Sequence, residues 1–134
     1  MARILVIDDD KSVAATVRAM LEANGYNAFV ADGGRAALRA VELFAFDAIV
    51  VDMVMPEING LDVIKIVRAD APDVPIIAMS GHAFVGGSND LDFFQAARML
   101  GADHCLQKPF RARELVEAIE SCRAARSAGA CQVA

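Results

Sequence analysis

The chain has 134 residues, of which 56% are hydrophobic and 23% charged, so its length and composition fit one globular domain with a substantial core. The net charge of −5 at pH 7 disfavours binding to a phosphate backbone, and we expect no nucleic-acid partner. The three cysteines are an odd number without CxxC spacing, which argues against a disulfide framework and a zinc site.

The chain begins with a short apolar segment that leads directly into acidic residues. Residues 3–7, RILVI, predict a strand, and DDD follows at positions 8–10. An apolar run of this length, with aspartates after it, is too short and too acidic for a signal peptide or a membrane span. We therefore expect a cytoplasmic location and no membrane partner.

Apolar runs and amphipathic stretches alternate along the rest of the chain. The runs predict strands at residues 3–7, 26–31, 47–51, 75–79 and 103–106, of which the first, third and fourth are apolar enough to be covered on both faces. Each run is followed by a stretch of helical periodicity, with Leu43 and Ile66 among the apolar positions assigned to the core and glycines 25 and 101 as stops. The alternation predicts a doubly wound parallel α/β sheet in three layers.

Polar residues stand where four of these strands end. They are Asp8, Asp9 and Asp10 after the first strand, Asp52 after the third, Ser80 after the fourth and Lys108 after the fifth. Asp52 interrupts an apolar run, where an unpaired carboxylate would cost several kcal/mol or take up a proton. Because sheets of this kind bind ligands beyond the carboxyl ends of their strands, we expect these groups to meet at one edge.

The gathered carboxylates predict a cation site with phosphoryl chemistry. Neighbouring carboxylates repel one another, and Mg²⁺ suits them because it binds carboxylate oxygens and keeps coordination positions for a phosphate. A carboxylate in such a site can act as a nucleophile toward phosphorus. Lys108 would supply a positive charge and Ser80 a hydroxyl donor to the phosphoryl oxygens.

The chain resembles the receiver domains of two-component response regulators. The segments that carry the resemblance are VIDDD at 6–10, VVDMVMPEING at 50–60, MSG at 79–81 and LQKPF at 106–110. It implies a flavodoxin-like (βα)5 fold with strand order 2-1-3-4-5. We assign residues 1–126 to this domain and expect residues 127–134 to form a flexible tail, without room for an output domain. The domain would be stand-alone or part of a longer protein.

The resemblance also implies a role for each site residue. Asp52 would accept a phosphoryl group from a histidine kinase or a histidine phosphotransfer protein. Mg²⁺ would be held by Asp8, Asp9, Asp52 and the backbone carbonyl of Val54. Ser80 and Lys108 would bind the phosphoryl oxygens, with Lys108 pairing with Asp52 or its phosphate. The rim would consist of Met53, Gly81 and His82, and the switch positions would be Ser80 and Cys105.

Two features depart from the family pattern. Receivers usually carry Tyr or Phe three residues before the lysine, where the ring couples phosphate capture to the output face, and here that position is Cys105. The segment 82–90, HAFVGGSND, lengthens the connection after Ser80 and contains paired glycines. We hypothesise that Ser80 and this segment report phosphorylation, and the alternative is a tolerated surface insertion.

Three functions fit these residues. The chain could be a phosphorylation-controlled interaction module, and such a module could form a homodimer. It could instead be a phosphorelay intermediate, which Cys105 mildly favours. It could also be a haloacid-dehalogenase-type phosphatase, because Asp8 and Asp10 have D-x-D spacing, although that function leaves Asp52 unexplained. We expect a signalling protein rather than a dedicated enzyme, with Mg²⁺-dependent self-phosphorylation from a phosphodonor. We also expect slow autodephosphorylation, because Val54 has no polar side chain to position water, unless His82 helps.

Overall fold

Five short strands form one parallel sheet in the order β2-β1-β3-β4-β5. The computed structural model describes residues 2–53, 55, 58–81 and 90–133, and the side chains of all these except 90–93 and 127–133. The strands are β1 (Arg3–Ile7), β2 (Asn27–Ala31), β3 (Ala48–Asp52), β4 (Ile76–Ser80) and β5 (His104–Gln107). The predicted order is confirmed, and each strand begins and ends within one residue of its predicted bounds.

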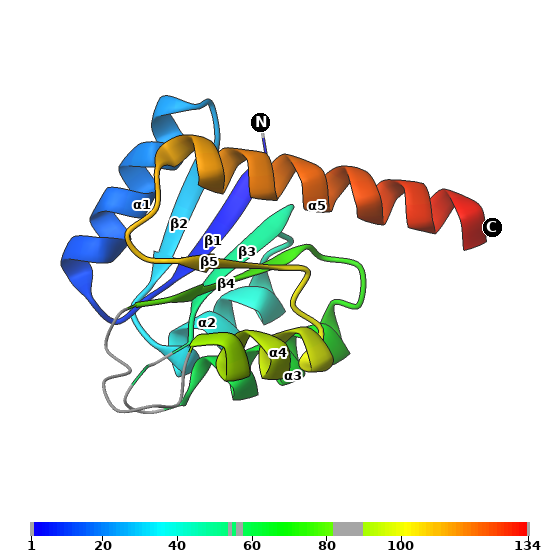
Figure 1. The fold of residues 1–134 in the computed structure, drawn as a ribbon, viewed down its shortest axis with the longest axis horizontal. Coiled ribbons are helices and arrows are strands. Elements are labelled where there is room, and N and C mark those ends of the chain that lie inside the picture. Colours follow the sequence, from blue (N-terminus) through cyan, green and yellow to red (C-terminus); the bar gives the residue numbers. More distant parts are fainter. Residues whose placement is uncertain (1, 54, 56–57, 82–89, 134) are drawn as a thin grey trace.

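Five helices cover the sheet on both faces (Figure 1). They are α1 (Lys11–Ala23), α2 (Gly34–Leu43), α3 (Gly60–Asp70), α4 (Asp90–Leu100) and α5 (Ala112–Val133). Helices α1 and α5 lie on one face, and α2, α3 and α4 lie on the other. The three-layer prediction is therefore confirmed. Among the described residues, none of the helices is both long and apolar enough to cross a membrane.

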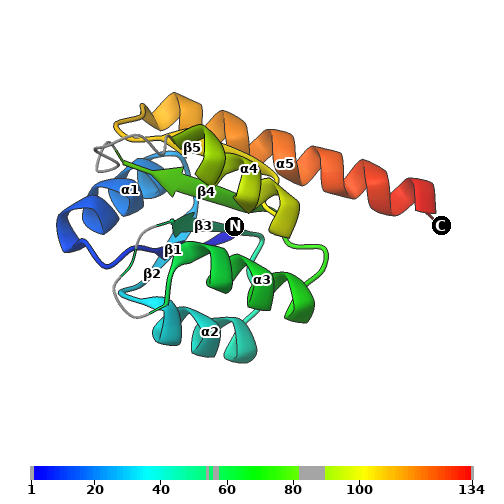
Figure 2. The same ribbon diagram turned by 60° about the horizontal axis from the view of Figure 1, so that its bottom comes forward.

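The last helix is longer than the sequence pattern predicted. Residues 127–133, which we expected to form a flexible tail, continue α5, and its C-terminal part extends past the body of the domain in Figures 1 and 2. The assignment of residues 1–126 to the domain stays a prediction.

Alternation along the strands divides the core into two parts. In β1, Ile4 and Val6 pack against α1 and α5, whereas Leu5 and Ile7 pack against α2, α3 and α4. Strands β3 and β4 are buried along their whole length, as predicted for strands covered on both faces. The side chains of each strand therefore form two rows, one that faces α1 and α5 and one that faces α2, α3 and α4. The side chain at the carboxyl end of a strand continues one of these rows.

Two apolar residues that we assigned to the core are exposed. Ile66 is 42% exposed because the buried stripe of α3 runs through positions 60, 63, 64 and 67, and a residue two positions after Ile64 points away from it. Leu43 is 66% exposed because it lies off the stripe of α2, at the last residue of the helix. In both cases a local apolar composition was taken for a core-facing position.

Helix ends follow the signals in the sequence. The Asp10 carboxylate caps α1 by accepting from the backbone N–H groups of Ser12 at 2.9 Å and Val13 at 3.2 Å. Gly25 and Gly101 follow α1 and α4 with positive φ angles of 87° and 122°, where glycine carries no steric penalty. The cap at Asp10 fixes how the chain leaves β1, directly beside the polar residues at the sheet edge.

At the opposite edge of the sheet, Asp103 connects α3 to α5. One of its carboxylate oxygens lies 3.1 Å from the guanidinium of Arg68, and the other lies 2.8 Å from that of Arg126. Arg68 also donates to the carbonyls of Gly101 and Val74, each at 2.6 Å. Burial lowers the pKa of Arg68, as does the neighbouring charge of Arg126. The cluster joins two faces of the domain far from the strand ends described next.

Candidate functional site

Three polar side chains from different strand ends fall on the same side of the sheet. Asp8, Asp52 and Lys108 continue the rows of Val6, Val50 and Leu106, which face α1 and α5. The pairing of Ile7 with Val51 brings the next residues, Asp8 and Asp52, beside each other. Both are buried, with 1% and 7% of their surfaces exposed. The predicted meeting of strand ends thus follows from the register of the sheet.

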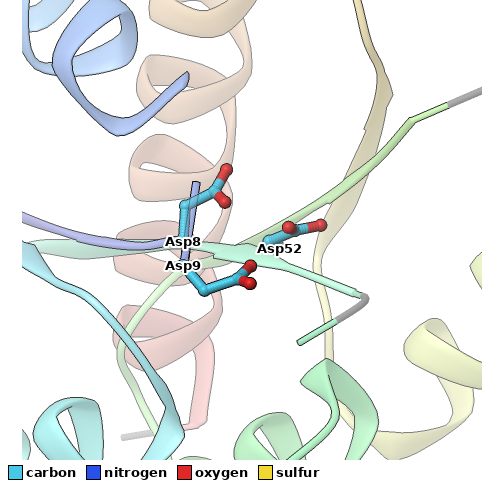
Figure 3. Close-up of side chains that lie close together, drawn as sticks. All are labelled: Asp8, Asp9 and Asp52. Atoms are coloured by element: carbon cyan, nitrogen blue, oxygen red, sulfur yellow. The ribbon is translucent and has the colours of Figure 1, made fainter. Parts of the chain in front are cut away.

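Asp8, Asp9 and Asp52 form a group that we call the carboxylate cluster. Each contributes a carboxylate oxygen, and these oxygens lie within 4.8 Å of one another. Figure 3 shows the side chains of Asp8 and Asp9, consecutive along the chain, beside that of Asp52. Asp8 and Asp52 are buried and Asp9 is exposed, so the cluster is open to solvent on one side. Ionised carboxylates this close repel one another strongly unless a cation is present.

Lys108 supplies one positive charge to the carboxylate cluster. Its ammonium nitrogen lies 3.1 Å from Oδ2 of Asp8 and 3.5 Å from Oδ2 of Asp52. The backbone N–H of Lys108 donates to the carbonyl of Ser80 at 2.6 Å, which continues the pairing of β4 with β5 and fixes where the side chain begins. Three carboxylates and one ammonium leave a net charge of −2 when all are ionised, which matches a divalent cation.

The Asp8 carboxylate is oriented on both of its oxygens. Oδ1 accepts from the backbone N–H of Asp10 at 3.0 Å, and Oδ2 accepts from Lys108 at 3.1 Å. The first of these contacts was not predicted, although an aspartate that bonds its own backbone two residues on is a common turn signal. Asp10 therefore acts on the site through its backbone, while its own carboxylate caps α1.

The chain after Asp52 turns sharply into α3. Met53 still belongs to the ladder, because its N–H donates to the carbonyl of Met79 at 2.9 Å, and its side chain is buried with 1% exposed. Met53 is thus a core residue, and our placement of it on the rim needs correction. Gly60 donates its N–H to the Met53 carbonyl at 3.0 Å, which brings the start of α3 back against the end of β3. Val54, the expected carbonyl ligand, lies outside the described residues.

Ser80 ends β4, next to Asp52 at the end of β3. Its side chain is completely buried, and its hydroxyl lies 3.5 Å from the carbonyl of Gly81. Gly81 is partly exposed, and its assignment to the rim stays a prediction. His82 and the rest of the segment 82–90 lie outside the described residues, except for Asp90, where α4 begins. The hypotheses about His82 and this segment stay predictions.

Cys105 packs against α4 instead of presenting a ring. It is partly buried beside the core formed with α2, α3 and α4, and its thiol donates to the carbonyl of Phe94 with a sulfur–oxygen distance of 3.8 Å. Burial raises the pKa of the Cys105 thiol, and the nearby charge of Arg98 offsets part of the rise. The thiol is therefore kept protonated, as a donor to the backbone of α4.

A hollow of about 400 Å³ lies beside the lysine, and sequence reasoning did not predict it. Its walls come from α1 and from the chain after β5, namely Ser12, Val13, Thr16, Val17, Met20, Lys108, Pro109 and Phe110. Most of these side chains are apolar or short. Lys108 thus lines the hollow and also contacts the carboxylate cluster. A partner placed against α1 would therefore approach the buried acidic residues.

Comparison with known proteins gives one consistent answer. A family model described as the response regulator receiver domain matches residues 4–120. Response regulator MprA of Mycolicibacterium vanbaalenii is 37% identical over 114 residues, which are 85% of this chain and 47% of that protein. The cell cycle transcriptional regulator CtrA of Caulobacter vibrioides is 30% identical over 119 residues, 89% of this chain and 49% of that protein. The chain therefore spans about half the length of these curated relatives.

Solved structures agree with the sequence matches. A response regulator receiver domain protein from Clostridium thermocellum superposes with a TM-score of 0.85 at 29% identity, covering 95% of this chain and 98% of that one. The likeness extends over nearly the whole of both chains and includes the order of the strands.

Proposed function

The chain belongs to the response regulator receiver domain family, and on this basis we propose that it accepts a phosphoryl group on Asp52 in two-component signal transduction. The observation that carries the proposal is the meeting of Asp8, Asp9, Asp52 and Lys108 at one strand edge. Asp52 is the member of this group that lies in a central, fully buried strand, so its carboxylate is held in a fixed position.

The donor set fits Mg²⁺. Mg–O distances are about 2.1 Å, so oxygens that share one ion lie no more than about 4.2 Å apart. Carboxylate oxygens within 4.8 Å of one another need only small side-chain rotations to reach this spacing. We propose Asp8, Asp9 and Asp52 as side-chain ligands, with the Val54 carbonyl as a further ligand. When bound, Mg²⁺ would neutralise charge on the phosphoryl oxygens and reduce their repulsion from Asp52.

In the proposed reaction, a carboxylate oxygen of Asp52 attacks the phosphorus of a phosphohistidine. A P–O bond to Asp52 forms, the P–N bond breaks, and the ring leaves as neutral imidazole, keeping the proton that its other nitrogen carried in the protonated phosphohistidine. Lys108 lies 3.5 Å from Asp52, where its ammonium can follow the negative charge onto the phosphoryl oxygens. The Ser80 hydroxyl is proposed to donate to one of these oxygens.

The proposed phosphodonor is a histidine kinase or a histidine phosphotransfer protein. Such a donor must bring an imidazole to a mostly buried carboxylate, so it needs a contact surface close to the site. The hollow between α1 and the Pro109–Phe110 segment supports this proposal because it shares Lys108 with the site.

Labelling with acetyl phosphate and Mg²⁺, followed by mass spectrometry, tests the proposed acceptor. We expect a stable label on the wild type and none on Asp52→Asn. Asp10→Asn is the matched control, because asparagine caps a helix as well as aspartate and the label should persist. Label that survives in Asp52→Asn and disappears in Asp8→Asn would contradict the proposal and favour the phosphatase, which the matches with known proteins do not support.

The use of the phosphoryl group is the second part of the proposal. An interaction module would bind its partner only when phosphorylated, whereas a phosphorelay intermediate would pass the group on to a histidine. A pull-down with and without beryllofluoride, which mimics the phosphorylated aspartate, separates the two. CtrA is named as a transcriptional regulator, but the matched region is about half of that protein. For this chain, a cytoplasmic location, the lack of a nucleic-acid partner and a possible homodimer stay predictions.

A further inference from the structure

Two glycines lie close to described residues between the end of β3 and the start of α3. We call residues 53–59, of which 53, 55, 58 and 59 are described, the β3–α3 loop. A Cβ atom on Gly60 would overlap the Asp52 carbonyl oxygen and lie 2.5 Å from the Met53 Cα atom. A Cβ atom on Gly34, the first residue of α2, would lie 2.7 Å from the Cβ atom of Ile58. One glycine thus fits against the start of the loop, and the other fits against its far side.

Space, and not backbone conformation, explains the glycine at position 34. Of the glycines that the structure describes, only Gly25 and Gly101 have positive φ angles. Gly34 is buried and helical, a setting in which alanine is intrinsically favoured over glycine. The atom it would meet is a Cβ atom, which no rotation of the Ile58 side chain can move, so the backbone at Ile58 or at the start of α2 would have to shift.

The contact with Gly34 is one of a few that hold the loop. Met53 and Met55 are buried in the core, Ile58 packs against the same core, and Asn59 caps α3. Helices α2 and α3 lie side by side in Figure 2. Ile58 lies against the first residue of α2 and stands two residues before the first residue of α3. Two residues after Ile58, the N–H of Gly60 donates to the carbonyl of Met53 at 3.0 Å, so a displacement at Ile58 would be transmitted to the residue that follows the proposed acceptor.

We propose that Gly34 is a positioning residue for the cation site: its missing side chain leaves room for Ile58, and the position of Ile58 sets how Gly60 packs against Met53 and Asp52. The inference rests on the proposed function, because it assumes that Mg²⁺ binds beside Asp52. Gly34 comes from a different βα unit and lies outside the carboxylate cluster, so it would act only through Ile58.

The test measures Mg²⁺ affinity without a phosphodonor, by isothermal titration calorimetry or by NMR titration. Supporting residues around a metal typically change its affinity by 10-fold or more, and we expect Gly34→Ala to weaken Mg²⁺ binding on the order of 10-fold. We expect Ile58→Ala to weaken it in the same direction. Alanine at position 58 keeps the Cβ atom that a Cβ atom on residue 34 would meet, so the double variant combines Gly34→Ala with Ile58→Gly, which removes that atom. Because the second change relieves the overlap caused by the first, the double variant should lose less than the product of the two single losses.

Gly101→Ala is the control for destabilisation alone. Its Cβ would meet Arg68 and its φ angle is positive, so the change strains the fold, but it lies at the opposite edge of the sheet. We expect a lower melting temperature with the wild-type Mg²⁺ affinity. Three results would overturn the inference. The first is wild-type Mg²⁺ affinity in Gly34→Ala, and the second is a loss of affinity in Gly101→Ala as large as that in Gly34→Ala. The third is a double variant whose loss equals the product of the two single losses.

Two further outcomes keep the test decisive. If Gly34→Ala does not fold, Ile58→Ala decides alone: weakened Mg²⁺ binding supports the inference, and unchanged binding overturns it. If the wild type neither binds Mg²⁺ nor is labelled on Asp52, the proposed function fails and takes the inference with it. If the wild type does both and the variants match it, only the role of Gly34 is wrong.

Discussion

Lys108 is bonded to Asp8, 100 residues earlier in the chain, with 3.1 Å between its ammonium nitrogen and Oδ2 of the carboxylate. The Asp8 side chain is fully buried, so this is an ion pair shielded from solvent on the acidic side. The proposed acceptor Asp52 is the second and more distant contact of the same ammonium, at 3.5 Å. The ammonium of Lys108 and a divalent cation would therefore compete for the same carboxylate oxygens.

Replacing Lys108 with methionine should separate cation binding from phosphoryl transfer. Without the ammonium, the carboxylate cluster loses its internal positive charge, and Mg²⁺ binding should tighten several-fold because unit charges at this distance interact by roughly 1–4 kcal/mol at effective dielectrics of 80 to 20. Labelling of Asp52 at saturating Mg²⁺ should slow on the order of 100-fold, since charge stabilisation is lost. Calorimetry and timed labelling measure the two effects, and parallel losses of both would contradict the model.

Replacing Asp9 with asparagine should remove most of the stabilisation that Mg²⁺ gives. A ligand that binds only the folded state raises its stability in proportion to the logarithm of ligand concentration over Kd. Without metal, the variant should melt at or above the wild-type temperature, because one of three repelling carboxylates is gone. Scanning calorimetry with Mg²⁺ and with EDTA gives both values. An unchanged Mg²⁺-induced shift in Asp9→Asn would show that this carboxylate is not a ligand.

Much of the site could be predicted from sequence because it follows from strand ends. Asp8, Asp52 and Lys108 stand at fixed positions relative to apolar strands, and parallel register brings such positions together. Met53 was misplaced because a residue after Asp52 was taken for loop, whereas its N–H still pairs with β4. The order of contacts around Lys108 depends on a long side chain's rotamer, which no sequence pattern encodes.

The packing of Ile58 on Gly34 is a second feature that could not be predicted from the sequence. The two residues belong to different βα units, and each obeys its own local pattern, a helix start and a loop. Their contact depends on the distance between α2 and α3, which side-chain volumes across the whole core determine. Ile66 shows the same limit, because only the actual phase of α3 separates it from its buried neighbours.

Replacing Asp103 with alanine should destabilise the fold and spare the site. Arg68 and Arg126 would be left as partly buried like charges without their shared carboxylate, at a cost of about 2–3 kcal/mol, somewhat below the range for fully buried pairs. Glu22→Ala, which breaks the exposed pair with Arg18, is the control and should change stability by less than about 1 kcal/mol. Urea unfolding measures both, and equal losses would refute the assignment. Mg²⁺ affinity should stay at the wild-type value.

Cys105 should make stability depend on alkaline pH. Burial raises the pKa of its thiol above the ordinary value of 9.0, so the folded state favours the protonated form. This contribution is fully present below the pKa of the unfolded chain and is lost as pH rises through the pKa of the folded one. Relative to Cys105→Ser, the wild type should therefore lose unfolding free energy as the pH rises past about 9. The other cysteines are common to both proteins, and a constant difference across this range would count against a raised pKa.

Replacing Gly60 with alanine should cost more stability than a typical surface change. The new methyl group would overlap backbone atoms of Asp52 and Met53, which cannot move aside as a flexible side chain can. We expect a loss of about 1–3 kcal/mol, the usual range for overpacking. Thermal or urea unfolding measures the loss. Gly81→Ala, whose Cβ would meet no atom of the described residues within 4 Å, is the comparison for stability, and similar values for the two would refute the close contact.

Side chains alternate between the two faces of the sheet along each strand, and this determines which site residues face which helices. Asp8, Asp52 and Lys108 continue rows that face α1 and α5, whereas Ser80 and Cys105 continue rows that face α2, α3 and α4. The proposed contact of Ser80 with the phosphoryl oxygens would then link two sides that are otherwise separated by a wall of close-packed apolar side chains. The proposed phosphorylation would be communicated around the carboxyl edge of this wall, through the neighbouring ends of β3 and β4, and not through the core. Substitutions deep in either core and away from this edge should therefore change stability without changing how the signal is passed.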